Sequence, residues 1–379
     1  MAGDALIVDA VRSPIGKRNG SLAAVRADDL AAQVLNALVA RAGLDPAAVE
    51  DVQLGCVTQV GEQGWNIARM AALVAGWPES VCGTSVDRQC GSSLQACFNA
   101  AAAVRSGELD VVVAAGVESM SRVPMGSNGG DLSPALLERF EIVPQGISAE
   151  VLAREWNLTR EQLDAYSLES HRRAVAAIDA GRFDAELAPV ALPDGGRFAV
   201  DETPRRDTSA EQLAALPPAF LPDGVVTAGN SSQIVDGAAA VLIASERACE
   251  RLGLRPRARF VSFGLAGVDP HRMLHGNPQA CDRALTRAGL TWDEVAAIEV
   301  NEAFASVVLQ FLADTGLGDR LADVNPNGGG ISLGHPLGAT GARVVATLLG
   351  ELERRGARYG VASMCIGFGQ AIAAVVERV

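Results

Sequence analysis

The hydrophobic positions of the chain form two alternating patterns, and each pattern predicts one kind of element. Short runs rich in apolar, β-prone residues predict strands, and they lie at 5–11, 52–57, 81–86, 110–116 and 360–364. The run at 110–116 is apolar throughout, as in a strand that is buried on both faces. Amphipathic or Ala-rich segments predict helices at 28–41, 66–75, 94–104, 159–180 and 338–355. This alternation is typical of an α/β protein in which helices cover a sheet.

The second half of the chain repeats the first. The tetrapeptide Arg-Ala-Gly-Leu at 41–44 recurs at 287–290, and three apolar positions that follow it match at the same offset. The unit of helix, Gly107 and strand 110–116 has a counterpart in helix 338–355, Gly356 and strand 360–364. Because the order of elements is shared as well as the residues, we predict a duplication of one α/β half.

A polar stretch of different character, 122–232, separates the two halves. It holds a Gly-rich segment at 126–130, a charged helix that begins with a capping box from Thr159 to Gln162, and a Pro/Arg-rich segment at 201–208. Excursions of this size commonly carry ligand contacts, although a structural cover is the alternative. We therefore expect an N-terminal half at 1–121 with 233–266, an inserted loop domain at 122–232, and a C-terminal half at 267–379.

Composition and charge exclude several classes of function. The net charge of −13 over 379 residues argues against nucleic acid or an anionic membrane as a partner, and no apolar run is long enough to span a bilayer. The seven cysteines form no CxxC pair, and neither they nor the four histidines have metal-ligand spacing. We expect no metal site and reduced thiols in the cytoplasm, because the N-terminus also lacks a signal-peptide pattern. Nearly all basic residues are arginines, which pair well with phosphate.

Cys90 lies where the β-prone run 81–86 gives way to the helix 94–104. That position is near a helix N-terminus, where free backbone N–H groups and the helix dipole favour a thiolate over a thiol. Gly91, Ser92 and Ser93 are small, so a substrate could approach the sulfur closely. The alternative is a buried and inert cysteine, which is common for a single Cys in an apolar protein.

Two further reactive residues stand in unusual surroundings. His335 lies in a Gly-dense loop, 325–341, with Pro336 at the first predicted helical position, so the backbone holds it and a role in acid–base chemistry is as probable as a structural one. Cys365 directly follows an apolar strand. Gly367 beyond it allows a close backbone approach, as an oxyanion site built from N–H groups requires.

Six segments in chain order resemble the thiolase family of acyl-CoA acyltransferases, and the resemblance extends over nearly the whole chain. They are Asp-Arg-Gln-Cys-Gly-Ser at 87–92, Val-Glu-Ser-Met-Ser at 117–121, Gly-Asn-Ser-Ser-Gln-Ile-Val-Asp-Gly-Ala-Ala at 229–239, Asn-Glu-Ala-Phe-Ala at 301–305, Gly-His-Pro at 334–336 and Cys-Ile-Gly at 365–367. The resemblance implies a duplicated five-layer αβαβα fold with the inserted loop domain.

The resemblance also implies a ping-pong reaction on 3-ketoacyl-CoA. His335 takes the proton of Cys90, whose thiolate attacks the 3-keto carbon, and Cys365 protonates the acetyl-CoA enolate that is released. Coenzyme A then attacks the acyl-cysteine. By resemblance, His335 and a water held by Asn301 stabilise one oxyanion, and the backbone N–H groups of Cys90 and Gly367 stabilise the other.

The contacts to coenzyme A follow from the resemblance as well. Arg205 matches a position near the CoA phosphates and Ser232 one beside the pantetheine arm, while apolar wall positions match Phe220, Ala228 and Phe304. For the two phenylalanines, ordinary core packing is the alternative. No permanently bound cofactor is implied, because coenzyme A and acyl-CoA enter as substrates.

Several departures from the family pattern bear on the substrate and the assembly. The segment 122–145 is shorter than the loop that builds the tetrameric biosynthetic enzymes, so we expect a homodimer, with a tetramer as the alternative. Pro144 and Gln145 replace His-Met at the acyl pocket, the segment 273–278 departs from Met-Gly-x-Gly-Pro, and Phe368 and Gln370 replace small residues. These changes favour a degradative enzyme, such as one of fatty-acid β-oxidation, that acts on a longer or bulkier acyl group.

Three alternatives stay open at this point. One is a biosynthetic acetoacetyl-CoA thiolase that condenses two acetyl-CoA molecules. A ketoacyl synthase shares the duplicated fold and the nucleophilic cysteine, but its sites use two His, or His and Asn, and Cys365 argues against it. The third is an inactive acyl-CoA-binding protein on the same scaffold, which fold by itself does not exclude.

Overall fold

The computed structural model describes residues 3–379, and its central feature is one mixed sheet of ten strands. The strand order is β10-β11-β12-β9-β1-β8-β5-β3-β4, with β2 beside β8. The strands are β1 (Leu6–Arg12), β2 (Gly16–Lys17), β3 (Asp51–Gly55), β4 (Cys82–Val86), β5 (Val111–Ser119), β8 (Val235–Ala244), β9 (Ala258–Gly267), β10 (Val295–Val300), β11 (Tyr359–Ile366) and β12 (Gln370–Arg378). In the middle of this order, β9 and β1 pair through only two residue pairs, and they connect a C-terminal group of strands (β9 to β12) with an N-terminal group (β1 to β5 and β8).

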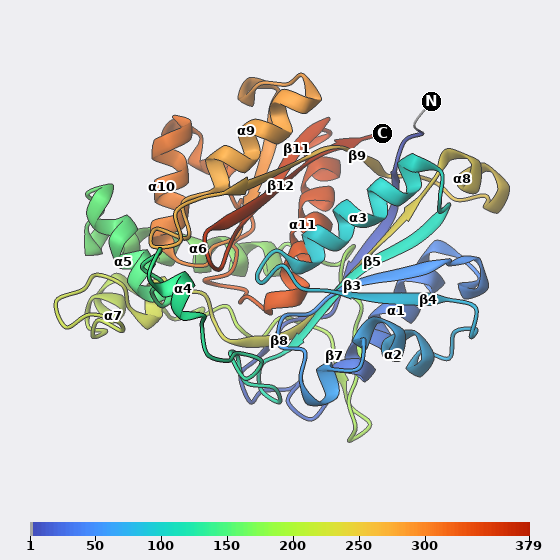
Figure 1. The fold of residues 1–379 in the computed structure, drawn as a ribbon, viewed down its shortest axis with the longest axis horizontal. Helices are drawn as coiled ribbons and strands as arrows, with labels where there is room; N and C mark the ends of the chain where they lie inside the picture. Colours follow the sequence, from blue (N-terminus) through green and yellow to red (C-terminus); the bar gives the residue numbers. More distant parts are fainter. Residues whose placement is uncertain (1–2) are drawn as a thin grey trace.

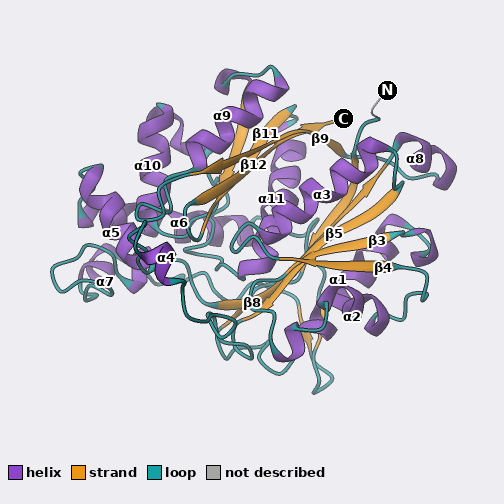
Figure 2. Ribbon diagram, viewed as in Figure 1, coloured by secondary structure: helices purple, strands orange, loops and turns teal. Residues whose placement is uncertain are grey.

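Helices form three layers around the two groups of strands (Figures 1 and 2). The outer layer of the N-terminal group holds α1 (Ala27–Ala42) and α2 (Ile67–Val74), and the outer layer of the C-terminal group holds α9 (Asn277–Ala288) and α10 (Ala305–Thr315). Between the groups lie α3 (Ser92–Ser106) and α11 (Thr340–Arg355), which contact strands of both. The order helix, sheet, helix, sheet, helix confirms the five-layer α/β architecture.

The duplication is visible in the backbone. Gly43 ends α1 with φ 64° and ψ 28°, and Gly289 ends α9 with φ 68° and ψ 29°. Both are left-handed helix caps, a conformation that glycine adopts at little cost, and this explains why Arg-Ala-Gly-Leu occurs twice. Gly107 and Gly356 cap α3 and α11 in the same way.

The strand pairing corrects one predicted boundary. The segment 233–266 was assigned to the N-terminal half, but it contains both β8 and most of β9. β8 pairs with β1 and β5, whereas β9 pairs along its whole length with β12 of the C-terminal group. Apolar residues of β9 are buried against α9 and β12, so the division follows α8 (Glu246–Leu252) between these strands.

The excursion 122–232 contains α4 (Pro134–Leu137), α5 (Gln145–Glu155), α6 (Arg160–Asp179), α7 (Ala210–Ala214) and a hairpin of β6 (Val190–Ala191) and β7 (Arg197–Phe198). The expected capping box of Thr159 and Gln162 begins α6. Both α5 and α6 pack against α10. The buried Arg12 of β1 donates to Glu186 at 2.5 Å and to Asp201 at 2.7 Å. The excursion is therefore fastened to both halves. Its treatment as a domain of its own stays a prediction.

The middle layer depends on glycines where α3 and α11 meet. A Cβ atom at Gly341 would overlap the backbone nitrogen of Leu94, and one at Gly116 would overlap the carbonyl oxygen of Gly338. The hydroxyl of Ser93 accepts a hydrogen bond from the Ala342 N–H at 2.9 Å across the same contact. Only glycine permits this approach of backbones. Among residues 3–379, no helix has the length and apolar character needed to cross a membrane.

We expect Gly341→Ala to destabilise the protein by about 3 kcal/mol or more, because overpacking a fixed helix contact displaces backbone. Gly350, on the same helix, has no atom within 4 Å of a built Cβ, so Gly350→Ala is the matched control. It should stabilise by about 0.5–1 kcal/mol. Urea-unfolding midpoints of both variants measure this. Equal midpoints for the two would show that the contact tolerates a methyl group.

Candidate active site

Cys90 sits in a tight turn between β4 and α3. Gln89 before it has φ 46°, a left-handed conformation that is uncommon for a side chain other than Gly, Asn or Asp. The hydroxyl of Ser92 holds the turn, because it accepts from the Arg88 N–H at 3.0 Å and donates to the Gln89 carbonyl at 2.5 Å. A Cβ at Gly91 would lie 2.6 Å from Ile366, so the turn also fits closely against β11. Backbone strain of this kind is typical of functional turns.

The sulfur of Cys90 faces hydrogen-bond donors but is a thiol at rest. Burial raises the pKa of Cys90 to about 11, against the N–H groups of Gly367 and of Cys90 itself and the side-chain amide of Gln145, which lower it. The expectation that the helix N-terminus favours a thiolate is therefore wrong for the free enzyme, because the loss of hydration at a site 5% exposed outweighs the dipole. The same donors lie where an oxyanion formed on Cys90-bound substrate would need them.

His335 is buried and its ring is oriented from one side. Its Nδ1 lies 2.6 Å from the hydroxyl of Thr340, and that hydroxyl donates to the Pro336 carbonyl at 2.9 Å. The hydroxyl oxygen therefore accepts from Nδ1–H, which leaves Nε2 as the basic nitrogen. Asn301 Nδ2 lies 3.4 Å from Nε2. Pro336 precedes a 3₁₀ turn, Leu337–Ala339, and α11 begins only at Thr340, so Pro336 is not the first helical residue as expected.

The charge state of His335 follows from its burial. Burial and the positive charge of Arg343 lower the pKa of His335 to about 3. The imidazole is therefore neutral at physiological pH and can accept a proton. A neutral imidazole of this kind can serve as a general base.

Cys365 and Asn301 come together because β10 and β11 are parallel neighbours. The Asn301 N–H donates to the Ser363 carbonyl at 2.9 Å, two residues before Cys365. Burial, then the nearby Cys90, raise the pKa of Cys365 above the range of an ordinary thiol. Asn301 Oδ1 is buried and has no hydrogen-bond partner in the part of the chain that the structure describes. A free buried acceptor of this kind suits a bound water or a substrate hydroxyl.

Two buried glutamates that sequence reasoning did not single out hold the catalytic loop. Glu118 accepts from the N–H groups of Val57 at 3.0 Å and Gly338 at 2.9 Å. Glu302 accepts from the Ile331 N–H at 3.0 Å and from the hydroxyl of Tyr166 at 2.7 Å. An acidic residue inside an otherwise apolar motif was the available signal in both cases, since a buried carboxylate must be paired.

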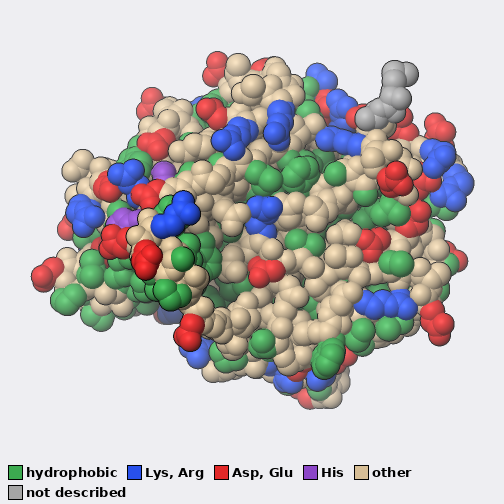
Figure 3. All heavy atoms as spheres, viewed as in Figure 1, with side chains coloured by type: hydrophobic (Ala, Val, Ile, Leu, Met, Phe, Trp, Pro, Cys, Tyr) green, Lys and Arg blue, Asp and Glu red, His purple; other side chains and the backbone are tan. Residues whose placement is uncertain are grey.

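A cavity of about 390 Å³ opens beside Cys90. Gln89, Gln145 and Gly367 form its polar part, and its apolar lining consists of Met125, Val143, Pro144, Gly146, Phe220, Met273, Phe304 and Phe368. The rings of Phe220 and Phe304 meet edge to face with centroids 6.1 Å apart. Hydrophobic side chains also gather on the surface over α4 and α7 (Figure 3), and Phe368 at the cavity is 47% exposed.

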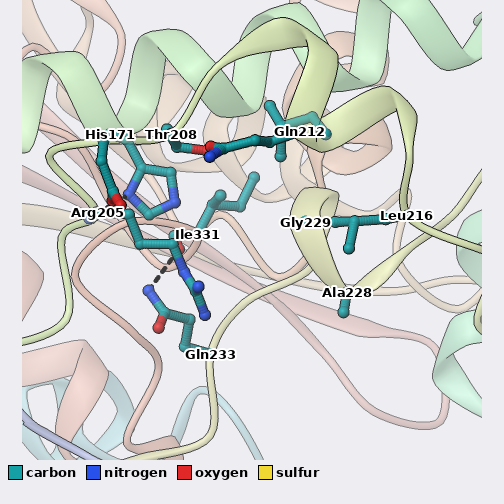
Figure 4. Close-up of a pocket in the computed structure, with 11 residues that line it drawn as sticks. His171, Arg205, Thr208, Gln212, Leu216, Ala228, Gly229, Gln233 and Ile331 are labelled. Carbon is teal, nitrogen blue, oxygen red and sulfur yellow. Dashed lines mark hydrogen bonds between the residues drawn. The ribbon is translucent and has the colours of Figure 1, made fainter.

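The other predicted CoA contacts lie on two further cavities. A cavity of about 650 Å³ is lined by Arg205, Ala228 and Ser232 together with Lys17 and Arg18. Arg205 and Ala228 also line a cavity of about 260 Å³, in which the imidazole of His171 lies beside Arg205 (Figure 4). The N–H of Ser232 donates to the Ala303 carbonyl at 2.9 Å, and Ser231 forms a β-bridge with Phe304. This short bridge joins the cavity of about 650 Å³, which Ser231 lines, to the cavity of about 390 Å³, which Phe304 lines.

Within residues 3–379, no group of three or more His, Cys, Asp or Glu side chains could hold a metal ion. The site therefore consists of thiols, an imidazole, amides and backbone N–H groups. These are the groups of an acyl-transfer centre with a covalent cysteine.

Comparison with known proteins identifies the class. The family model described as thiolase, N-terminal domain, matches residues 5–247, and thiolase, C-terminal domain, matches 254–378. The chain belongs to the thiolase family and is an acyltransferase. The predictions of family, enzyme class and duplicated α/β fold are confirmed. The two models meet between β8 and β9, in agreement with the strand pairing.

Curated relatives and solved structures of similar sequence carry thiolase or acetyltransferase names. A steroid 3-ketoacyl-CoA thiolase of Mycobacterium tuberculosis is 47% identical over 99% of this chain and 94% of that protein. A 3-ketoacyl-CoA thiolase of Erwinia tasmaniensis is 47% identical over 99% of both. Among solved structures, the acetyl-CoA acetyltransferase of Bacillus anthracis matches with a TM-score of 0.93 and 39% identity over 100% of this chain and 99% of that one.

We expect the His335 ring to stay neutral between about pH 8 and pH 5, since its pKa is about 3 and not the usual 6.5. Below pH 6.5 the unfolded chain binds this proton and the folded one does not, so stability decreases as the pH falls from 6.5 toward 3. Nitrogen chemical shifts of labelled histidine measure the titration, with His335→Gln to assign the signal. A midpoint near 6.5 for His335 would contradict the burial argument.

We expect Thr340→Val to reduce turnover about 5- to 30-fold, the effect of losing an orienting hydrogen bond of roughly 1–2 kcal/mol. The isosteric valine keeps the packing but removes the hydrogen bond to Nδ1 of His335. The ring is then no longer held in the tautomer whose basic nitrogen is Nε2. Thr347→Val is the control, because Thr347 lies on the same helix and its hydroxyl donates to Glu186. Turnover and the His335 nitrogen shifts should change together in Thr340→Val only.

Proposed function

We propose that this protein is a degradative 3-ketoacyl-CoA thiolase with Cys90 as nucleophile, His335 as its base and Cys365 as the acid–base group on carbon. The observation that carries the proposal is the shared position of these groups. The Gly367 N–H faces the Cys90 sulfur, Cys90 lies near Cys365, and Asn301 Nδ2 lies 3.4 Å from Nε2 of His335. These contacts support a site that combines a nucleophile, two proton-transfer groups and an oxyanion site, and Gly367 also lines the apolar cavity.

In the proposed reaction, every group that gives or takes a proton returns to its starting state at the end of the cycle. Nε2 of His335 accepts the Cys90 proton as the sulfur attacks the 3-keto carbon. The bond between the α and β carbons then breaks, the electron pair goes to the α carbon, and the Cys365 proton follows to give acetyl-CoA. The thiol proton of incoming coenzyme A restores Cys365, the CoA sulfur takes the acyl group, and His335 returns its proton to Cys90.

Two oxyanions form during these steps, and two sets of donors are available. The N–H groups of Cys90 and Gly367 suit the oxygen of the acyl-cysteine intermediate, with Gln145 as a third donor beside them. The protonated Nε2 of His335 and a water on the free Asn301 oxygen suit the oxygen of the enolate.

Coenzyme A fits the cavity that contains Arg205, Ser232 and Ala228. Lys17, Arg18 and Arg205 line it and form no ion pair with any described residue, so their charges are available to phosphates. From there the arm would pass Ser232 and the bridge to Phe304, between the second and first cavities. Phe220 and Phe304 would then flank its end.

The acyl group occupies the apolar cavity beside Cys90, and its size favours a longer or bulkier group than acetoacetyl. This supports the degradative direction over condensation of two acetyl-CoA molecules, the second candidate. Relatives named steroid 3-ketoacyl-CoA thiolase and 3-ketoacyl-CoA thiolase are each 47% identical to this chain.

We further propose a homodimer in the cytoplasm. β4 is an edge strand of the sheet, half exposed along its length, and Trp65, Leu73 and Val74 near it are exposed apolar side chains. Such an edge suits pairing with a second copy of the chain. All seven cysteines are free thiols, as in proteins of a reducing compartment.

The test is thiolysis of a series of 3-ketoacyl-CoA esters with coenzyme A. Wild type should form acetyl-CoA, fastest with acyl groups longer than acetoacetyl, and Cys90→Ala should lose at least about 10³-fold in rate because the covalent step is removed. Cys97→Ala, which alters another buried cysteine in the helix that follows Cys90, is the control. A wild type that binds CoA esters but cleaves none would make it a binding protein, and a preference for acetoacetyl-CoA would favour the biosynthetic reading.

A further inference from the structure

Asn277, the first residue of α9, is a buried side chain with an unused donor. It is 0% exposed, and its Oδ1 accepts a hydrogen bond from the Ser363 hydroxyl at 2.9 Å. Its Nδ2 has no hydrogen-bond partner among residues 3–379. A buried N–H group without a partner costs free energy, so a native protein retains one chiefly where a further group uses it. The segment that contains Asn277 is also one of the departures from the family pattern noted in the sequence.

The unused donor lies over the catalytic face of β11. Ser363 and Cys365 are two residues apart on that strand, so their side chains share a face. A Cβ at Gly276 would lie 2.9 Å from the Cβ of Ala371, and Ala371 is the cross-strand partner of Cys365. The start of α9 is therefore packed directly against the Cys365 position.

The Asn277 side chain acts on the pKa of Cys365 in the direction that proton transfer to carbon requires. Burial and the nearby Cys90 raise the pKa of Cys365, and the Asn277 side chain acts on it in the opposite direction. Ser363 holds the carbonyl end of the amide, which leaves the N–H end free for a further partner. A neutral donor stabilises a buried thiolate without adding a second buried charge, which would itself need a partner.

We propose that the Asn277 amide donates a hydrogen bond to the Cys365 thiolate and so adjusts Cys365 as the proton-transfer group on the α carbon of the acetyl unit. This inference rests on the proposed thiolase reaction. In cleavage, Cys365 loses its S–H proton to the α carbon as the carbon–carbon bond breaks, and Asn277 stabilises the thiolate that remains. In the reverse direction, the stabilised thiolate removes an α proton from acetyl-CoA.

The experiment separates the chemistry of Cys365 from that of Cys90. Exchange of the α protons of acetyl-CoA with deuterated water, followed by NMR, reports Cys365. Acylation of the enzyme by a saturated acyl-CoA, followed by mass spectrometry, reports Cys90. The variants are Asn277→Leu, which removes the amide, and Asn277→Asp, which keeps the shape and the Ser363 contact but replaces the donor by an acceptor.

Both variants should slow α-proton exchange about tenfold or more while acylation changes by less than about twofold, since the lost bond is made to a charged group of Cys365 only. The pH at which exchange accelerates should rise by about one unit. Ser363→Ala, which releases the carbonyl end of the amide, should give a smaller decrease. Gln310→Leu removes an equally buried amide from α10 and is the control.

The inference is overturned if exchange is unchanged in either folded variant, or if exchange and acylation decrease by the same factor, as a general structural defect would cause. Should Asn277→Leu fail to fold, Asn277→Asp and Ser363→Ala decide the question. A wild type that neither exchanges α protons nor cleaves 3-ketoacyl-CoA would refute the proposed function itself. An active wild type with insensitive variants would refute only the role of Asn277.

Discussion

The close contact between α3 and α11 is the constraint on which the rest of the structure depends. Gly341 lets α11 approach α3, and Gly116 and Gly338 let β5 approach the turn before α11, at backbone distances where any Cβ would collide. Cys90 precedes α3 and His335 precedes α11, so the proposed nucleophile and its proposed base stand just before the two helices that this contact joins. Packing and catalysis are therefore parts of the same arrangement, and neither could change without the other.

Burial sets the electrostatics of the site. It raises the pKa values of Cys90 and Cys365 and lowers that of His335, so all three are neutral at rest. Charges appear only as protons move, and fixed donors then meet them in surroundings that exclude water. Buried carboxylates support this indirectly, because Glu118 and Glu302 bind backbone N–H groups of the loop instead of touching the reacting atoms.

Local patterns predicted much of this molecule correctly. The capping box at Thr159 and the strand predicted at 110–116 depend on neighbours in sequence, and the structure has both, with the strand at Val111–Ser119. The expectations that the structure corrected concern features that depend on burial or on distant parts of the chain. The thiolate expected at Cys90 ignored burial, the boundary at 266 ignored the partner of β9, and the roles of Glu118 and Asn277 depend on segments far away in the chain.

The sequence by itself determined the class of fold and the duplication and supplied the candidates for the reactive side chains, because propensity, periodicity and motif chemistry are properties of short segments. Tertiary structure alone decided which nitrogen of His335 is basic, which charge states the thiols have, and which donors face each sulfur. Those properties arise from contacts such as that of Thr340 with His335 and that of Asn277 with Ser363, and from the exclusion of water, which exists only once the layers are packed.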